Sequence, residues 1–317
     1  MKLASSSTLI PERACTMPIL RFRSIEFCIH STKLAVNPIV YKLPQERRLM
    51  SKAPITTGDT RISCVIDEIG VALVTIERPE KRNAMALSMW TALRDIFLDL
   101  GQRSDLRCII LTGKGDHFCA GADISEFDKV RADSAAGLKY DRINDETTLA
   151  IRDCPKPVIA AVSGFTVGGG LGLALACDFR VAHSSLRAGI PAGRLGLVYS
   201  VLDCSLLVER LGLTAAKEVL LTGAIVDLDN ARRLGLTDRV TEGNVVEAAH
   251  ELAAEIARNA PLSLAGNKAI LNALANGTAK DRAGELENLI ARAFDSDDYR
   301  EGQRAFAERR PAVFCGR

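Results

Sequence analysis

Residues 160–178 read AAVSGFTVGGGLGLALACD, and this stretch joins a strand to a helix through a run of glycines. Val158 to Val162 is a short apolar run that follows two prolines, which predicts a buried strand entered from a loop. The glycines at 168–170 allow the backbone to turn sharply. Leu171 to Cys177 has only small or apolar side chains, so we expect a short helix that is packed closely on all sides.

The start of this helix is suited to holding a negatively charged or polarised oxygen. A buried helix N-terminus after glycines presents unpaired backbone N–H groups and the positive end of the helix dipole. A second turn of small residues, FCAGADI at 118–124, follows the apolar strand Cys108 to Leu111. One N–H from each turn could stabilise the charge that develops on a carbonyl oxygen during a reaction. The alternative is that both are tight strand-to-helix turns whose small residues serve packing.

These motifs, in this order, resemble the enoyl-CoA hydratase and isomerase family, the crotonase superfamily. The resemblance rests on residues 118–126 and 157–178, with LTG at 221–223 and GL at 235–236, and it runs from about Cys64 to the C-terminus. It implies an α/β fold, a crotonase-like spiral of repeated ββα units followed by a C-terminal helical region that makes subunit contacts. A homotrimer or a dimer of trimers is the expected assembly.

Three regions are therefore expected. Residues 1–55 are expected to form a disordered or targeting-like N-terminal extension, residues 56–255 the spiral core, and residues 256–317 the helical oligomerisation region. Within the core we predict a hairpin at 62–66 and 71–76, helices at 88–100 and 134–152, and strands at 108–112 and 179–182. Later helices are expected at 214–223, from Asp227 or Asp229 to 235, and at 244–259, 266–276, 282–294 and 299–309.

The resemblance also implies a chemistry. Members of the family bind acyl-coenzyme A, with coenzyme A as part of the substrate and no other cofactor, and hold the thioester oxygen while an enolate forms. Matched residue by residue, the two backbone donors are Ala122 and Gly169. The coenzyme A portion is expected to contact Lys81, Arg82, Ala84, Ala120, Asp123 and Ile124. Lys81 and Arg82 are natural partners for its phosphates, the alternative being two solvated loop charges.

The sequence departs from the family where hydratases carry two glutamates, one to activate water and one to deliver a proton. The first belongs three residues after the oxyanion-hole glycine, and Gly172 stands there. The second belongs after the proline of a later loop, and Ala192 follows Pro191. The isomerases often keep only the second, which Ala192 also removes. We therefore expect a reaction other than standard two-glutamate hydration.

Other side chains could take over the chemistry. Tyr199 falls where some family decarboxylases for malonyl-type CoA esters place a tyrosine, and decarboxylation needs an oxyanion hole but no base to start it. Glu126 is the preferred substitute carboxylate. Asp203 is interpreted as a helix cap. The open alternatives are decarboxylation, double-bond isomerisation, weak hydration that uses Glu126, and a non-catalytic scaffold that binds CoA esters.

The amino-acid composition argues against several other classes of protein. The longest apolar runs fall short of the 18 or more residues of a membrane span. Residues 1–50 carry eight Lys or Arg against three Glu, so they are +5 while the remainder is −3, and this mildly acidic body gives no reason to expect nucleic acid binding. Nine scattered cysteines and four histidines form neither a disulfide nor a metal-ligand pattern, so we expect no metal and a reducing, cytoplasmic location.

The N-terminal extension leaves that location open. Residues 1–50 are rich in Arg and Ser, as transit peptides to a mitochondrion or another organelle are, although three glutamates are unusual there. The alternative is an upstream extension that precedes a true start at Met50.

Overall fold

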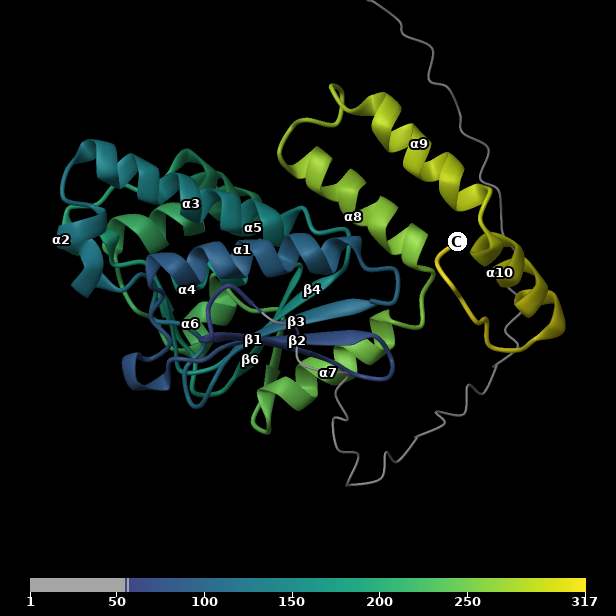
Figure 1. The fold of residues 1–317 in the computed structure, drawn as a ribbon, viewed down its shortest axis with the longest axis horizontal. Coiled ribbons are helices and arrows are strands. Elements are labelled where there is room, and N and C mark those ends of the chain that lie inside the picture. The colour runs from purple at the N-terminus through teal and green to yellow at the C-terminus, as the bar shows by residue number, and fades with distance from the viewer. Residues whose placement is uncertain (1–54, 56) are drawn as a thin grey trace, which may run out of the picture. The chain divides into compact units, whose positions relative to one another are not determined.

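The computed structural model describes residue 55 and residues 57–317, which are built around a six-stranded sheet (Figure 1). Its strand order is β1-β2-β3-β4-β6-β8, and every neighbouring pair is parallel except the hairpin of β1 and β2. The strands are β1 (Ile62–Ile66), β2 (Val71–Ile76), β3 (Cys108–Gly113), β4 (Val158–Val162), β6 (Phe179–His183) and β8 (Arg239–Thr241).

Helices cover both faces of this sheet, because parallel strands are usually buried on both sides. On one face, α7 (Val245–Ile256) packs its apolar side chains into a cluster with residues of β3, β4 and β6 (Figure 1). The other face carries α1 (Leu87–Gln102) and α4 (Gly169–Ala176), with α3 (Ser134–Arg152) packed on both helices. All five residues of β4 are buried, which explains its uninterrupted apolar sequence.

The layered α/β arrangement predicted from the sequence is confirmed. The hairpin strands and the helix at 134–152 have the predicted bounds, and α1 differs from the prediction by one residue at its start and two at its end. Sequence analysis missed a second, two-stranded parallel sheet of β5 (Phe165–Val167) and β7 (Arg187–Gly189). Each strand has only three residues, too few for an alternating pattern, yet β5 leads directly into α4.

The remaining helices follow the core along the chain. They are α2 (Phe127–Val130), α5 (Val201–Thr222), α6 (Leu228–Arg233), α8 (Pro261–Ala275), α9 (Ala283–Phe294) and α10 (Asp297–Glu308), with 3-10 turns η1 (Pro79–Lys81), η2 (Ile124–Glu126) and η3 (Ala192–Leu195). The backbone of α5 is broken at Gly212, so the helix predicted at 214–223 is its second half. Asp227 and Asn244 cap α6 and α7, as expected.

The C-terminal helices belong to the same compact unit as the core. The Lys268 ammonium of α8, which is buried, contacts the Asp178 carboxylate at 2.7 Å. An apolar groove of about 640 Å³ runs between α8, α9 and α10, where Phe294 and Phe306 are exposed. The oligomerisation role of residues 256–317 stays a prediction.

The predictions for residues 1–54, including the transit peptide and the start at Met50, lie outside the described residues. Of the helices in the described part of the chain, none combines the length and the apolar character that a bilayer crossing needs.

Candidate functional site

A short strand pairing brings the two predicted turns together. The backbone N–H of Cys119 donates to the Phe165 carbonyl at 3.0 Å, and the N–H of Val167 donates to the Cys119 carbonyl at 2.9 Å. The turn at 118–122 therefore lies alongside β5, and the turn at 168–170 follows at the end of that strand. The two segments are far apart in sequence, and this pairing makes them neighbours.

Glycines allow the two turns to approach closely. Gly121 has φ +91, and a Cβ atom there would lie 2.8 Å from the Val167 carbonyl oxygen. A Cβ atom at Gly170 would lie 2.2 Å from the Cys119 carbonyl oxygen, a distance that would force the backbones apart. The glycines are thus needed for packing, as the alternative interpretation held, and the same close packing brings the two predicted donors near each other.

Both predicted backbone donors are free. Across the described residues, neither the N–H of Ala122 nor that of Gly169 donates a hydrogen bond to the protein. Both residues are half-buried, and backbone N–H groups away from bulk water are rarely left unpaired. Gly169 is the first residue of α4, so its N–H also lies at the positive end of a helix. Two such donors on adjacent turns can hold one oxyanion.

The loop that precedes α1 supports the first turn. The N–H of Ala120 donates to the Arg82 carbonyl at 3.0 Å, and the N–H of Met85 donates to the Gly121 carbonyl at 2.8 Å. Buried Asn83 fixes this loop by donating from Nδ2 to the carbonyls of Lys114 and His117. The predicted coenzyme A contacts Ala84 and Ala120 are therefore neighbours, and their backbones belong to the frame of the site.

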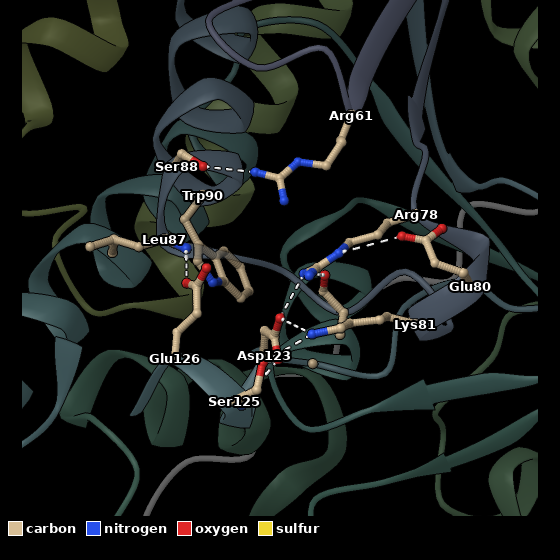
Figure 2. Close-up of polar contacts among 12 residues, drawn as sticks. Arg61, Arg78, Glu80, Lys81, Leu87, Ser88, Trp90, Asp123, Ser125 and Glu126 are labelled. Atoms are coloured by element: carbon tan, nitrogen blue, oxygen red, sulfur yellow. Dashed lines mark hydrogen bonds and ion pairs between the residues drawn. The ribbon is translucent and has the colours of Figure 1, made fainter. Parts of the chain in front are cut away.

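Figure 2 shows that Lys81 is committed to a structural contact. Its ammonium group contacts the buried Asp123 carboxylate at 2.9 Å and the Ser125 hydroxyl at 3.0 Å. The guanidinium of Arg78 approaches the same carboxylate at 2.8 Å. Burial opposes ionisation of Asp123, but hydrogen bonds from Ser125, Lys81 and Arg78 outweigh it and lower the pKa of this carboxyl. Much of the Lys81 charge is thus already used within the protein.

Arg82 and Ile124 face solvent beside this frame. The Arg82 guanidinium lies 4.5 Å from the centre of the Phe165 ring, and the residue is exposed. Ile124 follows the first turn and is 55% exposed. Both predicted contacts therefore remain accessible to a bound coenzyme A.

Glu126 lies near the first turn, where its carboxylate accepts a hydrogen bond from the N–H of Leu87 at 3.0 Å (Figure 2). Leu87 begins α1, and the preceding Ala86 has no side chain that could cap the helix. The carboxylate therefore serves a helix N-terminus that would otherwise have an unpaired donor. Its predicted role as a substitute base stays a prediction, now in competition with this structural role.

Neither glutamate position carries a titratable side chain, but another carboxylate reaches the first of them. Ala192 is 7% exposed and belongs to the hydrophobic core. A Cβ atom built at Gly172 would lie 3.7 Å from Oδ1 of Asp203, which projects from α5. The interpretation of Asp203 as a helix cap is wrong. Ser200 is the cap, because its hydroxyl accepts the hydrogen bond from the N–H of Asp203, the third residue of the helix.

Two titratable groups face the same helix. The Tyr199 hydroxyl lies 3.6 Å from the position of a Cβ atom at Gly168, beside the second turn. Burial raises the pKa of Tyr199, so its phenol keeps its proton at neutral pH. Burial, with a smaller contribution from the Asp145 charge, raises the pKa of Asp203 to about 6. Asp203 can therefore exchange protons near neutral pH, a property that sequence reasoning missed because the causes are tertiary.

Aromatic side chains also lie close to the start of α4. The Trp90 ring would lie 3.0 Å from a Cβ atom at Gly169, and its Nε1 donates to the Tyr140 hydroxyl at 2.8 Å. The Arg131 guanidinium stacks 4.5 Å from the centre of the Tyr140 ring and pairs with Asp141. The start of α4 is thus approached by Trp90 at Gly169, by Tyr199 at Gly168 and by Asp203 at Gly172.

Over residues 55 and 57–317, no three His, Cys, Asp or Glu side chains gather as metal ligands would. The prediction that the site works without a metal stays a prediction.

Comparison with known proteins gives consistent matches. A family model described as enoyl-CoA hydratase/isomerase matches residues 67–317. Enoyl-CoA hydratase EchA19 of Mycobacterium tuberculosis is 34% identical over 250 residues, which cover 77% of this chain and 93% of that protein. The short-chain-enoyl-CoA hydratase of Clostridium acetobutylicum is 31% identical, with 76% and 92% covered.

Solved structures agree with the sequence matches. The crystal structure of an enoyl-CoA hydratase/carnithine racemase from Magnetospirillum magneticum superposes with a TM-score of 0.77 at 35% identity and covers 82% of this chain and 97% of that one. DspI of Pseudomonas aeruginosa gives a TM-score of 0.75 at 30% identity, with 83% and 100% covered. The predicted crotonase-like fold is confirmed by these likenesses.

Proposed function

This chain belongs to the enoyl-CoA hydratase/isomerase family, and from that membership we propose an acyl-CoA enzyme that holds a thioester enolate between the backbone N–H groups of Ala122 and Gly169. The observation that carries the proposal is the pair of unused N–H donors on two adjacent turns. Donors fixed by the fold stabilise the oxyanion without reorganising during the reaction. Coenzyme A enters as part of the substrate, with Arg82 and Ile124 as its accessible contacts.

The reaction differs from two-glutamate hydration. Gly172 and Ala192 leave no carboxylate at either family position, and Ala192 is enclosed by the core. An enolate can still form by removal of one proton or by loss of carbon dioxide, so double-bond isomerisation and decarboxylation fit the site. We propose that the enzyme acts as a homotrimer or a dimer of trimers, since residues 256–317 expose apolar side chains along a groove.

A specific observation favours decarboxylation of a malonyl-type acyl-CoA as the second candidate. The protonated Tyr199 hydroxyl lies beside Gly168, where it could donate a hydrogen bond to a substrate carboxylate. Carbon dioxide release from methylmalonyl-CoA that is lost in Tyr199→Phe would support it. Release that is unchanged in that variant would remove the tyrosine from the mechanism.

The variant Gly169→Pro tests the proposed function, because proline removes one N–H donor and is well tolerated at the first residue of a helix. Any Cβ atom at this position presses on the Trp90 ring. Gly169→Ala is therefore the matched control, since it adds the same Cβ atom and keeps the N–H. We expect Gly169→Pro to turn over acyl-CoA about 100-fold more slowly than Gly169→Ala, as the loss of one oxyanion donor typically costs.

The same pair of variants separates an enzyme from a non-catalytic scaffold. A scaffold would bind an acyl-CoA with no turnover in the wild-type protein or in either variant. Equal turnover in Gly169→Pro and Gly169→Ala would contradict the enolate hole. Circular dichroism establishes that both variants are folded before the rates are compared.

A further inference from the structure

Gly172 has no side chain on α4, and a residue of another helix approaches this position. Gly172 lies three residues after Gly169, which is about 4.5 Å along the helix and on the same face. Oδ1 of Asp203, on α5, lies 3.7 Å from the position of a Cβ atom at 172. A carboxylate is thus present near the site of the first family glutamate, although it comes from a different element of the fold.

We propose that Asp203 is the catalytic acid–base of this site and carries one proton to and from the acyl chain, an inference that rests on the proposed enolate hole. The geometry carries it: Gly169 supplies an oxyanion donor at the start of α4, and Asp203 approaches the next turn of the same helix. Asp145, the other nearby carboxylate, accepts a hydrogen bond from the Ser200 hydroxyl at 2.8 Å. Ser200 also caps α5, so this contact ties Asp145 to the N-terminus that presents Asp203.

The proton balance fits a single carboxylate. Ionised Asp203 removes a proton from the carbon next to the thioester carbonyl of a 3-enoyl-CoA. The electron pair moves to the carbonyl oxygen, which Ala122 and Gly169 hold as the enolate. The protonated carboxyl then delivers the same proton to the carbon at the far end of the double bond, which gives the 2-enoyl-CoA. No water, oxidant or second acid is needed. Because the step shifts a double bond along the acyl chain, the substrate class is an unsaturated acyl-CoA.

The surroundings of Asp203 suit a group that must change its protonation state during each turnover. Burial and the Asp145 charge on α3 disfavour its ionised form, while the Ser200 hydroxyl and the Arg131 charge after α2 favour it. On its own segment it faces Tyr199 and Cys204, whose ionisation its negative charge opposes. These opposing effects leave the pKa of Asp203 at about 6, close to the pH at which proton transfer works best.

The test uses the full chain with 3-butenoyl-CoA, and liquid chromatography with mass spectrometry separates the substrate from its 2-enoyl isomer and follows the conversion. Asp203→Asn keeps the shape and removes the base, so we expect isomerisation to slow by about 100-fold or more. The ultraviolet absorbance of the acetoacetyl-CoA enolate reports the hole separately, because this ligand forms an enolate in solution. We expect Asp203→Asn to keep that signal and Gly169→Pro to lose it.

Three results would overturn the inference. Isomerisation by Asp203→Asn within threefold of the wild-type rate would show that another group moves the proton. An acetoacetyl-CoA enolate signal in a wild-type protein that does not isomerise 3-butenoyl-CoA would show that the hole lacks this base. Absence of the enolate signal from the wild-type protein would overturn the proposed function, and the role of Asp203 with it.

Discussion

The two halves of the candidate site differ in what determines them. The proposed hole at Ala122 and Gly169 consists of backbone N–H groups, which many side-chain substitutions leave in place. The acid–base half depends on side-chain identity, and there Gly172 and Ala192 occupy the positions where the resemblance places the two hydratase glutamates. The difference teaches that a backbone site can survive substitutions that remove a side-chain site, which is why we propose that the proton carrier lies on another helix, at Asp203 of α5.

The largest effect is expected from a substitution that disrupts the backbone half of the site. A Cβ atom at Gly170 would lie 2.2 Å from the Cys119 carbonyl oxygen, so Gly170→Ala must push the two turns apart. We expect a loss of about 3 kcal/mol or more in the free energy of unfolding, measured with urea. Gly137→Ala is the control, because Gly137 lies within α3 with open space around it, and it should stabilise by about 0.5–1 kcal/mol. Equal effects would contradict the close approach of the turns.

A substitution in the side-chain half should raise the free energy of unfolding instead of lowering it, because the buried Asp203 carboxylate destabilises the folded protein. The pKa of Asp203 rises from 3.8 to about 6 on folding, so stability is lost as the pH rises through that window. Above pH 6, Asp203→Asn should raise the free energy of unfolding by up to about 3 kcal/mol. At pH 3.5 the difference should vanish. Urea unfolding at both pH values checks this, and destabilisation at pH 8 would indicate that the carboxylate has a structural role.

Two neighbouring cations should respond differently. Lys81→Met removes a partner of the buried Asp123, so it should destabilise by about 1 kcal/mol and change acyl-CoA affinity little. Arg82→Met, by contrast, should weaken acyl-CoA binding by about threefold to tenfold, with stability unchanged. Calorimetric titration with butyryl-CoA and urea unfolding measure the two effects. The reverse pattern would assign the phosphate contact to Lys81.

The smallest effect is expected for a substitution at Asp145, and it tests whether Asp203 is the base. Asp145 is a positioning residue, and its negative charge raises the pKa of Asp203. Asp145→Asn keeps the acceptor for the Ser200 hydroxyl and removes that charge. We expect the rising limb of the wild-type pH profile near pH 6, and in Asp145→Asn it should move to lower pH with the maximal rate nearly unchanged. A limb that stays in place would mean that Asp203 does not govern the profile.

The sequence predicted the parts of this molecule that depend on local patterns. The strands at 62–66 and 71–76, the helix at 134–152 and both turns have clear local signals, and all are present in the structure. The fold family also followed from motif order. The free N–H groups could be predicted as donors only because the turns matched that family.

What the sequence did not predict depends on contacts between distant elements. Asp203 looked like a cap because it stands near the start of a helix, and only the packing of α5 against α4 brings it to Gly172. Lys81 and Asp123 are 42 residues apart, so their ion pair has no local signature. Glu126 meets the N-terminus of α1 for the same reason.

The most direct measurement is a parallel turnover assay of the wild-type chain with crotonyl-CoA, 3-butenoyl-CoA and methylmalonyl-CoA, in which liquid chromatography separates isomers before mass spectrometry. An enolate hole without the two family glutamates predicts isomerisation of 3-butenoyl-CoA or carbon dioxide release from methylmalonyl-CoA, with no rapid hydration of crotonyl-CoA. Rapid hydration of crotonyl-CoA would contradict the account, because it would mean that the loss of carboxylates at Gly172 and Ala192 does not disable the standard reaction.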